Sequence, residues 1–265
     1  MRPFRILVVI PTLGERLETL CRTLSSIQAQ QDVSVDMVLV AKNKSDALTA
    51  IADRYRARII FVPGSISAAI NAGFAQTDET HKYAAWLGDD DMLKAGALAC
   101  SSALLEAQPT AVVAYGACDY VDINGELLFN RRPPPMAPLL LQFVPGLIKQ
   151  ETCLFRISAL RQINGLDETV KYTMDLDLLL KLRRLGPFVK TNQTLAAFCW
   201  HPGSLTVANR KASLSEAQQV QRKHARGITR LLQSLWKHPI RYLILILSWK
   251  INRDYSQTVV PSART

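Results

Sequence analysis

The first 75 residues alternate between short apolar runs and amphipathic stretches, and this alternation constrains the fold more than any other feature of the chain. Residues 5–10 form a nearly continuous aliphatic run, which is typical of a strand buried on both faces. After a break at Pro11, leucines recur at helical spacing through residues 15–30. The same unit repeats as strand 35–41 with helix 46–55 and as strand 58–62 with helix 66–75. This pattern predicts an α/β fold with a mostly parallel sheet, right-handed crossovers and flanking helices.

Three consecutive carboxylates, Asp89, Asp90 and Asp91, follow the apolar run at 83–87. The strand predicted there delivers them to its carboxyl end, the edge at which open α/β sheets bind ligands. Crowded carboxylates repel one another unless a cation neutralises them, which favours an oxygen-binding metal such as Mg²⁺ or Mn²⁺. The alternative interpretation is a solvated turn with one helix N-cap. The chain has neither GxGxxG nor GxxxxGK[ST], so a metal on the triplet is the candidate for holding a nucleotide's phosphates.

The second half of the chain contains shorter predicted elements. A helix at 95–107 is followed by strands at 112–115, 119–123 and 126–129, with a hairpin turn at 124–125. Asp175 and Asp177 open an apolar helix, and helix capping is one interpretation of Asp175. A final strand at 194–200 leads to His201.

Composition excludes several classes of protein. The chain has 265 residues and a net charge of +10, but ten Lys or Arg against two acids between residues 210 and 254 account for most of the excess. Because that segment has no recognised motif, nucleic-acid binding is not expected. The five cysteines fit neither a disulfide framework nor a CxxC metal site, which indicates a cytoplasmic protein. We find no signal peptide and no apolar run near the roughly 20 residues that a membrane-spanning helix needs.

Seven short motifs, in this order along the chain, give the sequence a family resemblance. They are residues 8–12 (VVIPT), 67–73 (SAAINAG), 87–91 (LGDDD), 150–152 (QET), 165–168 (GLDE), 174–177 (MDLD) and 201–204 (HPGS). Together they resemble the family 2 glycosyltransferases, an inverting group with the GT-A fold that builds bacterial polysaccharides. The resemblance covers roughly residues 4 to 206.

The resemblance implies a role for each candidate site residue. Asp91 is the expected metal ligand, with Asp90 and His201 as further metal or diphosphate contacts, and Asp175 is the expected catalytic base. The other implied residues are Pro11, Thr12, Glu15, Asn43, Asn71, Asp89 and Asp90 for the donor, and Gln150, Glu151 and Asp177 on the acceptor side.

Two positions depart from the family pattern. The first acid of the usual metal motif falls on Gly88, which leaves the separate roles of Asp89 and Asp90 open. The acid that usually binds the donor's base falls on Lys42, whose ammonium has no acceptor. Either Asn43 or Asp46 holds the base, or the donor does not carry the common uridine diphosphate.

The implied reaction is inverting transfer of a sugar from a nucleotide-diphosphate sugar to a saccharide or lipid-linked saccharide, in cell-surface polysaccharide synthesis, with Mn²⁺ or Mg²⁺. A metal absorbs the charge of the departing diphosphate, and one carboxylate base without a covalent nucleophile predicts inversion. The competing interpretations are a metal-dependent nucleotidyltransferase or phosphohydrolase, and a relative that binds a nucleotide sugar without turnover.

The expected domain organisation is a GT-A domain at 1–206 and a basic amphipathic helical tail at 207–265. Apolar residues recur at helical spacing from 212 to 236, arginines line another face, and residues 242–249 are apolar between Arg241 and Lys250. This pattern suits a segment lying on an anionic membrane surface, which would place the protein peripherally on the inner face of the cytoplasmic membrane. The alternative is a C-terminal helix packed on the domain with a solvated basic face.

Overall fold

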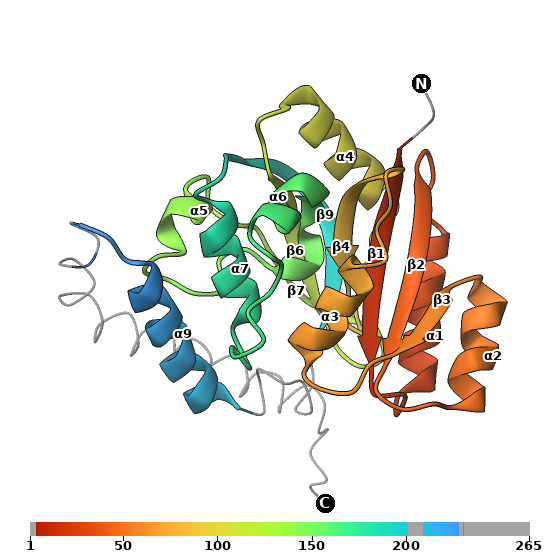
Figure 1. Cartoon of the computed structure of the whole chain (residues 1–265). Helices are drawn as coiled ribbons and strands as arrows, with labels where there is room; N and C mark the ends of the chain where they lie inside the picture. Colours follow the sequence, from red (N-terminus) through yellow and green to blue (C-terminus); the bar gives the residue numbers. More distant parts are fainter. Residues whose placement is uncertain (1–3, 201–208, 228–229, 231–265) are drawn as a thin grey trace, which may run out of the picture.

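The computed structural model describes residues 4–200, 209–227 and 230. Figure 1 shows one mixed α/β body with a central sheet between two layers of helices. The sheet has nine strands in the order β3-β2-β1-β4-β8-β6-β9-β5, and β7 pairs with β6 off this path. His201 lies outside the described residues, as does the tail beyond Arg230.

The N-terminal half is the parallel unit that the sequence predicts. Its strands are β1 Arg5–Thr12, β2 Ser34–Ala41, β3 Arg58–Phe61 and β4 His81–Trp86, joined through helices α1 Leu17–Gln28, α2 Asp46–Tyr55 and α3 Ile66–Phe74. The β1–β2, β2–β3 and β1–β4 pairs are all parallel. After β3 the chain crosses β1 to reach β4, so the strand order reverses between β1 and β4. Ligands bind at such a switch point.

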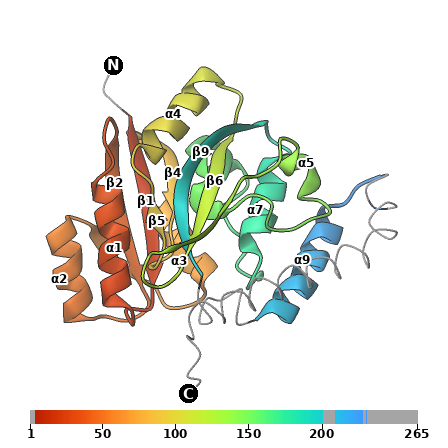
Figure 2. The same ribbon diagram turned by 180° about the vertical axis from the view of Figure 1, so that it is seen from behind.

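Side chains of the central strand alternate between two cores. On β1, Ile6 and Val8 share a core with residues of α1, α2 and the later helix α4 (Ala97–Ala107). Leu7 and Val9 share the other core with residues of α3, α6 (Ile157–Gln162) and α7 (Met174–Leu182). Figure 2 shows α1 and α2 on the face opposite to α3. A strand covered on both faces needs apolar residues at every position, which explains the uninterrupted run at the start of the chain.

The C-terminal half of the sheet is mixed in direction. Its strands are β5 Met92–Leu93, β6 Val113–Val121, β7 Leu127–Arg131, β8 Leu154–Arg156 and β9 Phe188–Cys199. Its helices are α4 Ala97–Ala107, α5 Ala137–Leu140, α6 Ile157–Gln162, α7 Met174–Leu182 and α9 Arg210–His224, with a 3₁₀ turn at Gln150–Thr152. Only the β6–β9 pair is parallel here, and the predicted hairpin is the antiparallel β6–β7 pair.

Two differences from the predicted elements have a clear physical cause. The two strands expected at 112–115 and 119–123 are one strand, β6, because Gly116 continues it rather than ending it. A Cβ at Gly116 would lie 2.7 Å from the carbonyl oxygen of Gln193, so only glycine allows β9 to approach where the register shifts. Strand β5 is absent from the prediction because two residues carry no periodicity.

Helix α9, the first part of the expected tail, packs against α7 (Figure 1). Its Ala217 and Val220 are buried in the core shared with α7. His224 and Lys223 contact carboxylates of the main body, at Asp177 and Asp167. The packed-helix alternative therefore describes residues 210–224. Among the described residues, no helix is long and apolar enough to cross a membrane.

Candidate functional site

The acidic triplet lies at the predicted place, directly after β4 and beside the end of β1. Asp89 is buried and both of its oxygens are occupied: Thr12 Oγ1 donates to Oδ2 at 2.6 Å, and Arg16 Nη2 lies 2.7 Å from Oδ1. The same guanidinium reaches Asp90 through Nη1, 2.6 Å from Oδ2. Arg16, the N-cap residue of α1, thus binds two of the three acids and supplies part of the positive charge that their crowding requires.

Asp91 is the deepest member of the triplet, with 3% of its surface exposed. Its Oδ1 accepts the backbone N–H of Cys199 at 3.0 Å, and its backbone carbonyl accepts the hydroxyl of Thr23 at 2.7 Å. The last residue of β9 and the middle of α1 therefore fix this side chain. Local sequence around the triplet contains neither partner, so the burial of Asp91 is a consequence of tertiary structure.

Gly88 explains how the first acid of the usual motif can be absent. A Cβ at Gly88 would lie 2.8 Å from Asp91 Oδ2 and 3.0 Å from Asp90 Oδ1. In each carboxylate, the other oxygen accepts a hydrogen bond: Asp91 Oδ1 from the Cys199 N–H, and Asp90 Oδ2 from Arg16. Two carboxylate oxygens thus converge on a space that any side chain at position 88 would fill.

A lysine and a glutamate join the triplet from the 3₁₀ turn. Lys149 Nζ lies 3.1 Å from Glu151 Oε1, and both side chains are largely buried. Burial, and then the charges of Glu151 and Asp90, raise the pKa of Asp91 well above its ordinary value. The ammonium of Lys149 also lies 3.6 Å from the ring centre of Phe198 on β9, a cation–π contact.

Asp175 occupies the start of α7 and reaches the same charges. Burial raises its pKa, Lys149 lowers it, and Glu151 adds a further upward shift. Asp91 and Asp175 are therefore linked electrostatically through one shared pair, Lys149 and Glu151. The charges of Lys149 and Glu151 thus act on both acids, which are separated by more than 80 residues in the sequence.

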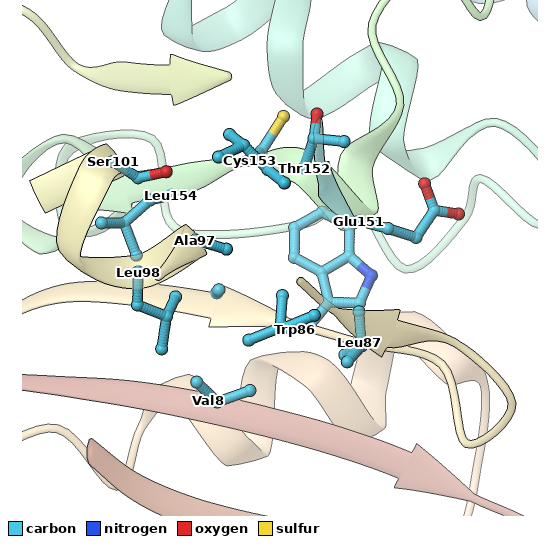
Figure 3. Close-up of a pocket in the computed structure, with 13 residues that line it drawn as sticks. Val8, Trp86, Leu87, Ala97, Leu98, Ser101, Glu151, Thr152, Cys153 and Leu154 are labelled. Carbon is cyan, nitrogen blue, oxygen red and sulfur yellow. The ribbon is translucent and has the colours of Figure 1, made fainter. Parts of the chain in front are cut away.

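A small, mostly apolar pocket lies behind this cluster (Figure 3). Trp86, Leu87 and Leu98 contribute to its wall, and Trp86 stacks on Phe155 with ring centres 5.2 Å apart. Glu151 also lines the pocket, but its carboxylate points away from the apolar side chains. The pocket is too apolar to bind a nucleotide's phosphates, and its side chains instead form part of the apolar packing next to the triplet.

The carboxylates fit a divalent ion that is also bound by its substrate. Asp90 Oδ1 and Asp91 Oδ2 converge beside Gly88, and burial together with the charges of Glu151 and Asp90 raises the pKa of Asp91. Among the described residues, no group of three or more His, Cys, Asp or Glu side chains could hold a metal ion. One or two carboxylates are nevertheless what Mg²⁺ commonly takes from a protein when phosphates complete its coordination.

Two predicted site residues have structural roles instead. Asn71 was expected to bind the donor, but its amide donates to the Leu166 carbonyl at 3.0 Å and accepts the Leu166 N–H at 2.9 Å. The side-chain amide of Asn71 therefore stabilises the loop before α7. Asp177 was expected on the acceptor side, but it is fully buried, 2.7 Å from both Lys181 Nζ and His224 Nε2. It points toward α9 because residues 175 and 177 lie on different faces of one helix.

The remaining expected donor contacts lie at the correct edge of the sheet. Pro11 and Thr12 end β1, and Asn43 is exposed just after β2, whose Ala41 pairs with Thr12. Glu15 is exposed in the loop between β1 and α1. On the other side of the cluster, Gln150 Oε1 is buried without a hydrogen-bond partner among the described residues.

Arg16 and Lys149 are the site residues that sequence reasoning missed. Lys149 directly precedes the Gln150-Glu151-Thr152 motif, and a lysine two residues before a candidate acid was the available signal. Arg16 had no such signal, since its partners are more than 70 residues away.

Comparison with solved structures shows the same fold. The mannosyltransferase PcManGT from Pyrobaculum calidifontis, in complex with GDP-Man and Mn²⁺, matches with a TM-score of 0.66 at 14% identity, over 99% of this chain and 77% of that chain. S. aureus TarS 1-349 in complex with UDP-GlcNAc matches with a TM-score of 0.63 at 13% identity, over 82% of this chain and 65% of that chain. The expected GT-A fold is confirmed. Its sheet, expected to be mostly parallel, is mixed, because β7 and β8 and the β5–β9 pair are antiparallel.

Sequence comparison identifies the family. An uncharacterized glycosyltransferase of Rickettsia bellii (strain RML369-C) is 26% identical over 175 residues, which are 62% of this chain and 25% of the relative. The chain thus spans about a quarter of the length of this curated relative. The family model described as glycosyl transferase family 2 matches residues 7–163, from β1 to the end of α6. This match covers more than half of the chain, which therefore belongs to glycosyl transferase family 2.

Proposed function

We propose that this protein transfers a sugar from a nucleotide-diphosphate sugar to a hydroxyl group of a saccharide or lipid-linked saccharide, with inversion at the anomeric carbon. The observation that carries the proposal is the position of two acids: Asp91 follows β4 with its Oδ2 beside Gly88, and Asp175 lies in the first turn of α7. The charges of Lys149 and Glu151 act on both. One carboxylate lies at the switch point where a nucleotide is expected, and the other lies at the start of a separate helix. Two carboxylates in different environments can take different roles.

The donor side is formed by the ends of β1 and β4. Asp91 and Asp90 would hold Mn²⁺ or Mg²⁺, which when bound neutralises charge on the departing diphosphate. Pro11 and Thr12 would line the nucleotide pocket, and Asp89 would keep Thr12 and Arg16 in place rather than contact the donor. A donor of this class agrees with the UDP-GlcNAc and GDP-Man complexes of structurally similar proteins.

The nucleotide base would lie over the end of β2. Lys42 and Asn43 are both exposed there. Because an ammonium donates but does not accept, Lys42 suits the carbonyl oxygens of a base rather than an imino N–H. Asn43 can both donate and accept, so we assign it the base contact.

Asp175 would act as the general base. As the acceptor oxygen attacks the anomeric carbon, its proton passes to the Asp175 carboxylate, and the bond from that carbon to the diphosphate oxygen breaks on the opposite face. The new bond therefore has inverted configuration. A pKa raised by burial makes a carboxylate a stronger base, and general-base catalysis contributes roughly 10²–10⁴ in rate.

A panel of nucleoside diphosphates and their sugars tests the proposal. Thermal shift with and without Mn²⁺ should show metal-dependent stabilisation by one nucleotide family. Asp91→Asn should abolish that stabilisation. Asp175→Asn should retain it but lose transfer by about 10²–10⁴. Hydrolysis of the donor with every acceptor tried, and no transfer, would instead indicate a phosphohydrolase.

A further inference from the structure

Two neighbouring acceptor oxygens on the 3₁₀ turn are buried without a hydrogen-bond partner among the described residues. They are Gln150 Oε1 and Glu151 Oε2. The other oxygen of Glu151, Oε1, lies 3.1 Å from Lys149 Nζ. This ion pair fixes the orientation of the carboxylate, while Oε2 has no hydrogen-bond partner among the described residues. Buried acceptors without partners are rare and cost free energy, which makes this pair a candidate for binding a ligand that donates hydrogen bonds.

The position of the turn shows which ligand is relevant. It packs against β4, which precedes the acidic triplet, and against β5, which follows it. The charge of Glu151 acts on Asp91 on one side and on Asp175 on the other. Glu151 therefore lies close enough to act on both the carboxylate assigned to the metal and the carboxylate assigned to the base.

We infer that Glu151 selects the donor sugar, with its Oε2 accepting a hydroxyl of an uncharged sugar, Gln150 accepting a second one, and acidic sugars rejected. This inference rests on the proposed function, in which the transferred sugar lies between the diphosphate and the base. It assigns Gln150 and Glu151 to the donor sugar instead of the acceptor side, where the family resemblance placed them. Both oxygens are acceptors without a donor among the described residues, and a sugar hydroxyl can supply the missing O–H donor. A hydrogen bond to a charged acceptor is also stronger than one between neutral groups.

Charge explains the rejection of acidic sugars. The described charged groups that act on Asp91 and Asp175 are Glu151, Asp90 and Lys149. Four acids are thus opposed by one lysine and by Arg16, which is paired with Asp90. A sugar carboxylate would bring another negative charge into a partly desolvated region where acids already outnumber the lysine. Like-charge contact of this kind is an effective way to discriminate against a competing ligand.

Calorimetric titration of the full chain in Mn²⁺ tests the inference with two ligand series. One series is UDP, UDP-glucose and UDP-glucuronic acid, and the other is GDP, GDP-mannose and GDP-mannuronic acid. In the series that the protein accepts, the neutral sugar nucleotide should bind more tightly than the diphosphate alone, and the acidic one more weakly. Glu151→Gln should reduce the advantage of the neutral sugar by about tenfold and also reduce the penalty on the acidic one.

Glu106→Gln is the matched control, because Glu106 pairs with Lys82 at the start of β4, away from the triplet. It should leave all ratios unchanged. Ratios within one variant do not depend on the fraction of folded protein, and Gln150→Leu provides the same test should Glu151→Gln fail to fold. An unchanged ratio of neutral sugar to diphosphate in these variants overturns the inference and leaves the proposed function standing. If neither series binds to the unmodified chain, the inference fails. The proposed function fails as well only if the wider panel of nucleoside diphosphates gives no metal-dependent stabilisation.

Discussion

Arg16 Nη1 lies 2.6 Å from Asp90 Oδ2, so the first residue after the β1 loop neutralises an acid that follows β4. The same guanidinium contacts Asp89. A chain that crowds three acids at one sheet edge thereby carries part of the necessary counter-charge itself. A bound metal ion would supply the rest.

Replacing this cation should make the protein more dependent on metal. In Arg16→Met, the acids lose the positive side chain that pairs with them. Because the arginine is partly exposed, we expect the free energy of unfolding to fall by only about 1 kcal/mol, or ~2–4 °C in Tm. Mn²⁺ should then raise Tm by more than in the unmodified chain, since the triplet is more negative. Arg22→Met, which removes a contact to a backbone carbonyl, is the control. Equal Mn²⁺ shifts in both variants would contradict this role for Arg16.

The space beside Gly88 should be required for metal binding. In Gly88→Ala, the new methyl group would lie 2.8 Å from Asp91 Oδ2 and 3.0 Å from Asp90 Oδ1, and would displace both oxygens. We expect Mn²⁺ affinity to fall by about 10–100-fold, as when groups that orient metal ligands are changed. Electron paramagnetic resonance of Mn²⁺ titrated with the protein measures this directly. Retained affinity would mean that the ion binds elsewhere.

Lys149 should set the pH at which the proposed base works. Burial raises the pKa of Asp175, and the positive charge of Lys149 opposes that shift. The base acts when deprotonated, so kcat/KM should rise with pH through this raised pKa. Lys149→Met removes the opposing charge and should move the acid limb of the profile to higher pH. A limb that stays in place, with Asp175→Asn still inactive, would show that Lys149 does not act on the base.

Helix α9 should hold the helix that carries Asp175. The Glu216 carboxylate accepts backbone N–H groups of Lys171, Tyr172 and Thr173 at 2.7–2.9 Å, just before α7. Glu216→Gln should lower the free energy of unfolding by about 1.5–3 kcal/mol at neutral pH, as measured by urea unfolding. Although burial acts to raise the pKa of Glu216, these hydrogen bonds lower it overall. Its contribution should therefore be complete above the ordinary glutamate pKa and vanish as pH falls through the lowered one, so the variant should lose this acid dependence.

Membrane binding by the basic tail should be tested with a truncation that keeps α9. A chain cut after Thr206 loses the contacts of Glu216 and His224, so its failure to bind would not be interpretable. A chain cut after Gly227 keeps every described contact of α9. If the tail binds membranes, the full chain should float with anionic vesicles, the chain cut after Gly227 should not, and neither should float with neutral vesicles. Equal flotation of the two chains would remove the proposed role of the tail.

Periodicity by itself determined the parallel half of the fold. The run that became β1 is buried along almost its whole length, whereas β2 is buried only in its second half and β3 is a partly buried edge strand. All three are apolar runs bounded by turn residues, and local patterns of this kind predict the element. Position after a buried strand also placed Asp89, Asp90 and Asp91 at the ligand edge. The mixed half was harder to predict because β5, β8 and the Gly116 register shift depend on which strands come together.

Only the tertiary structure decided which polar residues form the site. Asp175 and Asp177 are two positions apart and chemically identical, yet helix geometry turns one toward Lys149 and the other toward His224. Arg16 reaches its two acids across more than 70 residues, and Cys199 reaches Asp91 across more than 100. The sequence determines which side chains are available and which strand ends they follow. The charge balance of the site depends on distances and burial that arise only when separate strands and helices pack together.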